Sequence, residues 1–240
     1  MPITKETFQF MADLWDNNNK NWFNQNRERY VEHVREPMKE LADSLIAPVS
    51  AFLPDFNGKP KISRINADIR FNPKKKPYKE HVWISFYEEG QPISELFVYI
   101  GRNGWGAGVG AGARKREELD TWRENLLTHT DHWRNYAKAI GLGKNIMAHT
   151  GDPYKKPLYD DIPEDVYEEV QAKNIWIVDN GIRRKQKPAA DDFFERLCIF
   201  LPTYFFQTLP GKKLLTRLKD LGTTPKAPTP KVEKVWKAVK

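Results

Sequence analysis

The sequence predicts an α+β fold, with N-terminal helices, a mostly antiparallel sheet and further C-terminal helices in one domain. Three observations predict it. Apolar residues recur at helical spacing over the first 55 residues, they alternate with polar residues in segments between Lys61 and Ile100, and helical spacing returns beyond Gly112. No segment of helix length separates the alternating stretches, which favours antiparallel strands over parallel strands joined by helices.

The first 55 residues are expected to form helices. The first helix has apolar residues three and four positions apart: Phe8, Met11, Ala12 and Trp15. It should end at Asp16–Asn19, because Asp and Asn compete for backbone hydrogen bonds and favour helix caps. One of these asparagines can cap a second helix, which carries Trp22, Phe23 and Tyr30. Pro37 suits the first turn of a third helix, so a break or kink is expected near Glu36.

Three strands are expected next. In the first, Lys61–Phe71, one parity is apolar (Ile65, Ala67, Ile69, Phe71) and the other is polar (Arg64, Asn66, Asp68, Arg70). The segment from His81 to Tyr87 repeats this alternation, with Val82, Ile84 and Phe86 on one face and His81, Trp83, Ser85 and Tyr87 on the other. The segment Glu95–Ile100 supplies the third strand. Helices are expected again around Leu119–Leu127 and Phe193–Phe206.

A glycine run follows the third strand, with Gly104, Gly106, Gly108, Gly110 and Gly112 at every second position. The segment Gly106–Ala111 also satisfies a relaxed dinucleotide-binding pattern. We reject that interpretation, because the surrounding segments are not parallel βαβ units. If the strand continues through the run, the glycines share one nearly flat face. Such a face invites an aromatic ring, another backbone or a ligand, and a large core side chain or a helix is an equally good occupant.

The net charge of +7 is confined to the end of the chain. Residues 211–240 carry nine basic and two acidic side chains, so the first 210 residues are balanced, with thirty of each sign. A generally basic nucleic-acid-binding surface therefore loses support. We expect a single α+β domain over 1–210 and a basic Pro/Thr/Lys-rich tail over 211–240. Within the tail, 221–231 is an expected linker, and 231–240 has the spacing of a short helix that packs on its own domain or binds a partner.

Composition excludes several protein classes. No window has the roughly 18 uninterrupted apolar residues of a membrane span, and the N-terminus has no basic head followed by an apolar stretch. The chain is therefore expected to be neither membrane-spanning nor exported. Cys198, the one cysteine, lies in an apolar stretch and is expected to be a buried, inert thiol. A cytoplasmic location follows.

The sequence contains no recognisable metal or cofactor site. His129 and His132 are three residues apart with an acidic neighbour, but no third ligand accompanies them. No nucleophile elbow, phosphate-binding P-loop or zinc-protease helix motif is present. We therefore expect no metal and no cofactor.

The strongest candidate for chemistry is the basic segment Lys59–Lys79. Its polar strand face leads into a proline-rich loop that offers several ammonium groups. Arg and Lys side chains bind phosphate and carboxylate groups. The candidate ligand-binding residues are Asn18, Arg64, Arg70, Lys75, Tyr78 and Lys79. The candidate proton-transfer residues are Asp68 and His81. The structural alternative is an Arg64–Asp68–Arg70 ion-pair ladder beside a solvated lysine loop.

Several of these segments resemble the domain of unknown function 2461, a group of uncharacterised bacterial and fungal proteins. The resemblance is carried by Asn17–Phe23 with Asn26–Tyr30, by the Asp-x-Arg-Phe ending of Arg64–Phe71, by Lys75–Lys79 and by the Gly-Ala-Gly stretch. It covers most of residues 5 to about 205. The family usually has an acidic residue where this chain has Lys74. The resemblance implies a single α+β domain and supplies no reaction.

Two functions follow as hypotheses. The first is binding of a small phosphate- or carboxylate-bearing ligand at the basic strand-loop face, with a phosphate-ester or nucleotide-related reaction as the first enzyme class to test. The second is a non-catalytic interaction module whose basic tail recruits an acidic partner, RNA or a membrane surface. The sequence leaves open whether the chain is an enzyme and which oligomer it forms.

Overall fold

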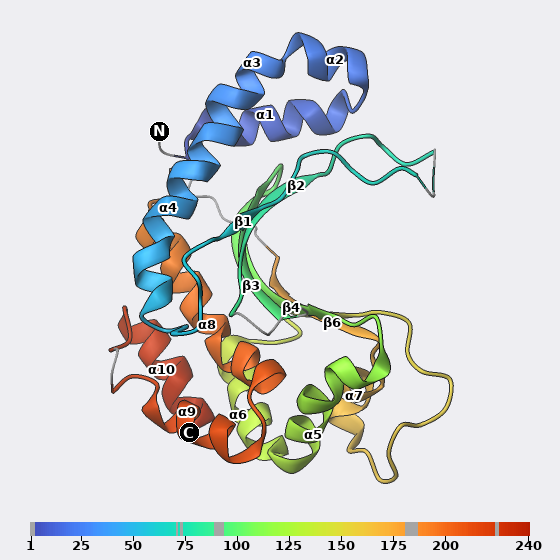
Figure 1. Ribbon diagram of the computed structural model, residues 1–240, viewed down its shortest axis with the longest axis vertical. Coiled ribbons are helices and arrows are strands. Elements are labelled where there is room, and N and C mark those ends of the chain that lie inside the picture. The colour runs from blue at the N-terminus through green and yellow to red at the C-terminus, as the bar shows by residue number, and fades with distance from the viewer. Residues whose placement is uncertain (1–2, 71, 73, 89–93, 181–186, 224–225) are drawn as a thin grey trace. The chain divides into compact units, whose positions relative to one another are not determined.

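The computed structural model describes residues 3–70, 72, 74–88, 94–180, 187–223 and 226–240, and it has the predicted α+β architecture (Figure 1). The α-helices are α1 (Lys5–Asp16), α2 (Lys20–Gln25), α3 (Arg27–Tyr30), α4 (Glu36–Ser50), α5 (Asp120–Thr128), α6 (Thr130–Ile140), α7 (Tyr167–Gln171), α8 (Ala190–Thr208), α9 (Gly211–Asp220) and α10 (Pro230–Val239). The strands are β1 (Lys61–Ile62), β2 (His81–Phe86), β3 (Ser94–Gly101), β4 (Gly104–Gly112), β5 (Ile146–Thr150) and β6 (Asn174–Asp179). They form one antiparallel sheet in the order β1-β2-β3-β4-β6-β5.

The chain forms two compact units. Unit 1 comprises Met1–Phe86, Phe97–Gly106 and Gly181–Phe194, and unit 2 comprises Tyr87–Leu96, Ala107–Asn180 and Glu195–Lys240. The single domain expected over 1–210 stays a prediction. In the described part of the chain, no helix is both long and apolar enough to cross a membrane.

The N-terminal helices of unit 1 follow the predicted boundaries. Asn19 begins α2, and its side chain accepts a hydrogen bond from the Trp22 N–H at 3.0 Å. The expected irregularity near Glu36 takes the form of one π-helical turn over Val31–Arg35, after which α4 begins with Pro37 in its first turn. Because proline has no N–H and its ring crowds the preceding turn, the wider π turn accommodates it without ending the helix.

The strand expected over Lys61–Phe71 is mostly absent, which corrects that prediction. Only β1 is regular, and the segment then pairs irregularly with residues 77–79, through an Ala67 N–H to Pro77 carbonyl bond and a Lys79 N–H to Ile65 carbonyl bond, both 2.9 Å. The alternation itself holds, since Ile65 is buried while Arg64, Asn66, Asp68 and Arg70 are exposed. Phe71 lies outside the described residues. The polar parity therefore faces solvent on a loosely paired arm.

The glycine run forms β4, and aromatic rings lie against its flat face. In unit 1, a Cβ added to Gly106 would come within 2.9 Å of the Tyr99 ring. In unit 2, a Cβ added to Gly110 would come within 1.9 Å of the Trp176 ring. Of the occupants that the sequence left open, the aromatic ring is the one that the structure contains at both positions. The glycines allow the two rings to lie low against the strand.

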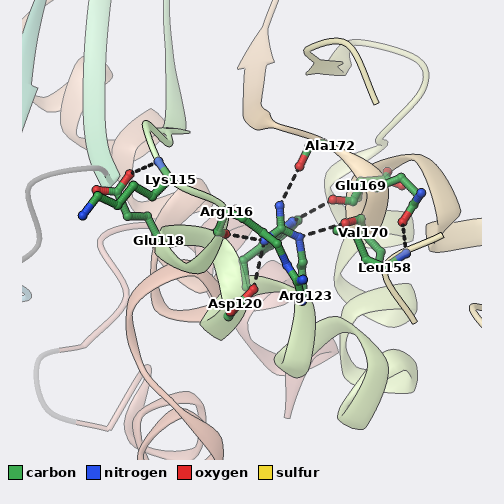
Figure 2. A network of polar contacts seen from close by, with 11 residues as sticks. Lys115, Arg116, Glu118, Asp120, Arg123, Leu158, Glu169, Val170 and Ala172 are labelled. Carbon is green, nitrogen blue, oxygen red and sulfur yellow. Dashed lines mark hydrogen bonds and ion pairs between the residues drawn. The ribbon is translucent and has the colours of Figure 1, made fainter. Parts of the chain in front are cut away.

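Unit 2 contains elements that the sequence analysis did not identify: β5, β6 and α7. Two side chains of α5 donate hydrogen bonds to the last carbonyls of the short helix α7 (Figure 2). Trp122 donates to the Glu169 carbonyl at 3.2 Å. The fully buried guanidinium of Arg123 donates to the carbonyls of Val170 (3.0 Å), Ala172 (2.8 Å) and Arg116 (2.7 Å), and to the Asp120 carboxylate (3.0 Å). The last carbonyls of a helix lack partners within the helix, so these side chains complete it.

The C-terminal helices also belong to unit 2. The expected short terminal helix is α10, which lies beside α6 (Figure 1) and buries Val232, Val235, Trp236 and Val239. Pro202 lies inside helix α8, in its buried part, and has no N–H to donate to the Cys198 carbonyl four residues earlier. The indole N–H of Trp236 donates to that carbonyl at 2.8 Å. Residues 230–239 are therefore part of the core of unit 2, as in the packed alternative that the sequence allowed.

Replacing Trp236 with Phe removes this donor and leaves the buried Cys198 carbonyl without it. We expect the free energy of unfolding to fall by about 2 kcal/mol, the usual cost of an unsatisfied buried polar group. Urea titration of the full chain measures it. In a Pro202→Ala background the restored backbone N–H can reach the same carbonyl, so Trp236→Phe should then cost less. An equal cost in both backgrounds would contradict this account.

Replacing Arg123 with Met should destabilise unit 2 by about 3–5 kcal/mol, because three carbonyls and the Asp120 carboxylate lose a buried cationic partner together. Thermal and urea unfolding report the loss. The matched control is Arg134→Met on the neighbouring helix α6, where an exposed guanidinium pairs with Asp131 and Asp165. Exposed pairs contribute less than about 1 kcal/mol, so Arg134→Met should destabilise the protein far less than Arg123→Met. Similar losses of stability from the two substitutions would contradict the role assigned to burial.

Candidate functional site

Three cations predicted as ligand-binding residues lie in one region of unit 1, where their charges act on one another. We name Arg64, Lys75 and Lys79 the cationic cluster. The half-buried Lys79 ammonium donates to the Arg64 carbonyl at 2.7 Å and lies 4.3 Å from the centre of the Trp83 ring. Burial lowers the pKa of Lys79, and the positive charges of Arg64 and Lys75 lower it further. Among the described residues, none of the three cations forms an ion pair with a carboxylate.

The loop that carries the cluster is fixed by Asn18 and Tyr78. The side-chain amide of Asn18 donates to the Tyr78 carbonyl and accepts from the Tyr78 N–H, both at 3.0 Å. The buried Tyr78 ring stacks on Phe23 at a centroid distance of 4.2 Å. These contacts give both predicted binding residues a role in positioning Lys75 and Lys79. That they also contact a ligand stays a prediction.

Asp68 and Arg70 form half of the ion-pair ladder that the sequence allowed. Arg70 donates from Nε and Nη2 to the two carboxylate oxygens of Asp68, at 3.0 and 2.7 Å, on an exposed part of the arm. The hydrogen bonds from Arg70 lower the pKa of Asp68 strongly. Within the described chain, no ion pair joins Arg64 to Asp68, and no hydrogen bond joins Asp68 to His81. The structure therefore does not bring the two candidate proton-transfer residues together.

His81 begins β2 and lies in a group of aromatic rings. Its ring centre is 5.4 Å from that of Trp83 and 6.0 Å from that of Tyr99. Although part of its side chain is exposed, desolvation by the surrounding chain is the largest influence on the pKa of His81 and lowers it, Glu80 raises it, and Lys79 lowers it. The net shift is downward from the ordinary value of 6.5, so the imidazole is neutral at pH 7 and can accept a proton.

A second cation group was missed by the sequence analysis. Lys76 Nζ lies 3.6 Å from the centre of the Trp15 ring and donates to the Trp15 carbonyl at 3.2 Å, and the Arg102 guanidinium lies 3.9 Å from the same ring. The helical spacing placed Trp15 on an apolar face, but it is only half-buried. Its position at the last turn of α1 is the signal that could have suggested cations, because helix C-termini attract them.

The histidine pair and the cysteine have structural contacts. The Nδ1 atom of His132 lies 2.9 Å from the Val239 carbonyl, at the end of α10. No group of three or more potential metal ligands lies together in the part of the chain that the structure describes. Cys198 is buried as predicted, and burial raises the pKa of its thiol, which keeps it protonated.

The chain matches a family model described as conserved hypothetical protein (DUF2461), over residues 6–197. The chain belongs to the DUF2461 family. This confirms the resemblance that the sequence motifs indicated. No curated protein matches the chain. All the candidate residues lie within the matched span, whereas α9 and α10 follow it. In this DUF2461 protein the helix that supplies Trp236 is thus an addition to the part matched by the family model.

The electrostatics of His81 can be measured by NMR titration of its imidazole protons. We expect a midpoint below 6.5 in the full-length protein. Lys79→Gln should raise the midpoint, because it removes a neighbouring positive charge, and Glu80→Gln should lower it further. Lys39→Gln on α4 is the charge-matched control and should leave it unchanged. A midpoint at or above 6.5 would contradict the assigned environment.

Proposed function

We propose that unit 1 binds a phosphate- or carboxylate-bearing ligand at the cationic cluster. The observation that carries the proposal is the cluster's unbalanced charge. Arg64 and Lys75 are exposed and act on the half-buried Lys79 with their positive charges, and none of the three forms an ion pair among the described residues. Repulsion between like charges raises the free energy of the unliganded state, and a bound anion replaces this repulsion with attraction.

The geometry of Lys79 supports the proposal. An ammonium has three N–H donors, and the Arg64 carbonyl is the acceptor that the structure gives to Lys79 among the described residues. Trp83 lies beside the ammonium and excludes water from one side. Partial desolvation strengthens a charge-assisted hydrogen bond to an incoming oxygen. Lys79 is therefore the residue on which affinity should depend most.

Arg70 has a secondary place in the proposal. Its planar fork is already bound to Asp68, so a ligand carboxylate or phosphate must compete with that carboxylate. Asp68 also acts electrostatically on Lys75, without an ion pair between them. If the bound anion is turned over, His81 is the proton acceptor that fits, since the hydrogen bonds from Arg70 lower the pKa of Asp68 strongly and make its carboxylate a weak base.

The proposed location is the cytoplasm, and the support is the single buried cysteine in a chain of 240 residues. The alternative function, recruitment of an acidic partner or RNA by residues 211–240, stays a prediction. Exposed lysines on α9 and α10 are available for it, but the apolar side of α10 is buried in unit 2. A truncation that removes α10 therefore cannot separate partner binding from stability, and the tests below use the full chain.

The test is calorimetric titration of the full chain with inorganic phosphate, ribose 5-phosphate and succinate, together with thermal shifts. Binding to the folded state raises the unfolding midpoint by mass action. Lys79→Gln should weaken binding of the best anion by about tenfold or more, because one charge-assisted hydrogen bond is lost. Arg70→Ala should have the smaller effect, since Asp68 already occupies its fork.

The control is Lys39→Gln, which removes one exposed ammonium from α4 and breaks only the surface pair with Glu36. It should leave affinity unchanged. The proposal is overturned if the wild-type protein binds none of the three anions, or if folded Lys79→Gln binds them as tightly as the wild type does.

A further inference from the structure

An aromatic surface adjoins the cationic cluster within unit 1. It consists of His81 and Trp83 on β2 and Tyr99 on β3, the neighbouring strand, and we name it the aromatic face. The apolar residues of the opposite parity, such as Val82 and Ile100, are buried in the core. On the aromatic face, Trp83 and Tyr99 are half-buried and His81 is exposed. Large rings with partly accessible surfaces are thus presented on the side of these strands opposite to the core.

Glycines allow close packing at two positions of the aromatic face. The Tyr99 ring occupies the space in which a Cβ of Gly106 would lie, at 2.9 Å. Gly101 lies opposite His81, where an added Cβ would come within 3.2 Å of the His81 Cβ. A ring that lies against a backbone on one side presents its other side outward. Such a surface suits a flat partner, which stacks on it without displacing side chains.

Lys79 belongs to both the aromatic face and the cationic cluster. Its ammonium lies 4.3 Å from the centre of the Trp83 ring and is the group around which Arg64 and Lys75 gather. A ligand anion at Lys79 is therefore next to an indole surface. A small inorganic anion would use the cluster and leave the rings without a role. A ligand with a planar ring attached to its anionic group uses both.

We infer that the ligand is a nucleoside phosphate, with its phosphate at the cationic cluster and its base stacked on the aromatic face. This inference rests on the proposed function and names its ligand class. Stacking of a base on an aromatic side chain contributes to affinity for every base, because each base has a π face. Charge from Lys and Arg fixes the phosphate, as in other proteins that bind single strands or nucleotides.

The second cation group, Lys76 and Arg102, adds positive charge near the end of the strands at which β2 begins. Arg102 directly follows Gly101, which lies opposite His81 and Glu80, so Arg102 lies at the same end of β2 and β3 as His81. It shares the Trp15 ring with Lys76, and neither cation has a carboxylate partner in the described residues. Glu80 is the acidic residue at this end and is exposed. Positive charge is thus concentrated at the end of the strands where β2 begins, which suits both a free nucleotide and a phosphate within a single strand.

The test compares adenosine 5′-monophosphate with ribose 5-phosphate, which has the same phosphate and sugar but no base. The full-length protein should bind the nucleotide at least about fivefold more tightly, the smallest effect expected from one base stack. Trp83→Leu should abolish this difference, so that the variant binds the nucleotide and ribose 5-phosphate equally tightly, whatever its effect on the phosphate site through Lys79. A single-stranded thymidine oligonucleotide forms the second arm, and it distinguishes a strand from a free nucleotide as the source of the nucleoside phosphate.

The matched control is Tyr167→Leu, which removes an exposed aromatic side chain in unit 2 and should change neither affinity. Saturation-transfer NMR on the wild-type protein does not depend on the folding of any variant, and adenine protons should receive the strongest transfer. Equal affinity for the nucleotide and ribose 5-phosphate, or transfer confined to the ribose, overturns the inference while the proposed function stands. If adenosine 5′-monophosphate, ribose 5-phosphate, phosphate and succinate all fail to bind, the proposed function fails as well.

Discussion

The fold of unit 2 depends on finding donors for buried carbonyl groups. Helix α8 is buried from Arg196 to Thr208, yet this part contains Pro202, which cannot donate a hydrogen bond. A buried carbonyl without a partner costs as much as several buried methylene groups contribute. Trp236 donates to the Cys198 carbonyl, and Tyr136 donates to the next carbonyl, that of Ile199, at 2.9 Å. This requirement explains why a helix that follows the family span is bound to the core rather than free.

The same constraint operates in the loop that carries the candidate site. The residues on either side of Tyr78, Pro77 and Lys79, form the backbone hydrogen bonds to residues 65–67. The N–H and carbonyl of Tyr78 itself therefore face the opposite way. Asn18 satisfies both with one side-chain amide, in the way that another strand would. The basic loop is thereby held to α2 and its preceding turn without a long ladder of hydrogen bonds. These hydrogen bonds help to hold Lys75 and Lys79 in one loop against the repulsion between their charges.

The sequence showed which side chains alternate between the core and solvent, but not which backbone groups are hydrogen-bonded. The alternation over Lys61–Phe71 correctly separated buried Ile65 from exposed Arg64, yet it could not show that regular pairing stops after Ile62. Periodicity reports which side chains face the core, whereas a strand also needs a partner whose register is set elsewhere. The strand β6 alternates too, with Ile175 and Ile177 buried and Trp176 half-buried. That signal was available in the sequence and was not recognised.

The sequence predicted which types of residue form the candidate site, but not the contacts between them. Lysines in a proline-rich loop indicated an anion site, but the cation–π contacts depend on Trp15 and Trp83, which a sequence places only on a helix and on a strand. Formal charges balance over the first 210 residues, so the field of the whole protein adds little attraction for anions there. Selectivity must then come from short-range terms, namely partial desolvation of Lys79 and the ring beside it. Salt screens short-range interactions of this kind less than it screens the exposed lysines of α9 and α10, so the two basic regions of the chain differ in how strongly salt weakens their attraction for an anion.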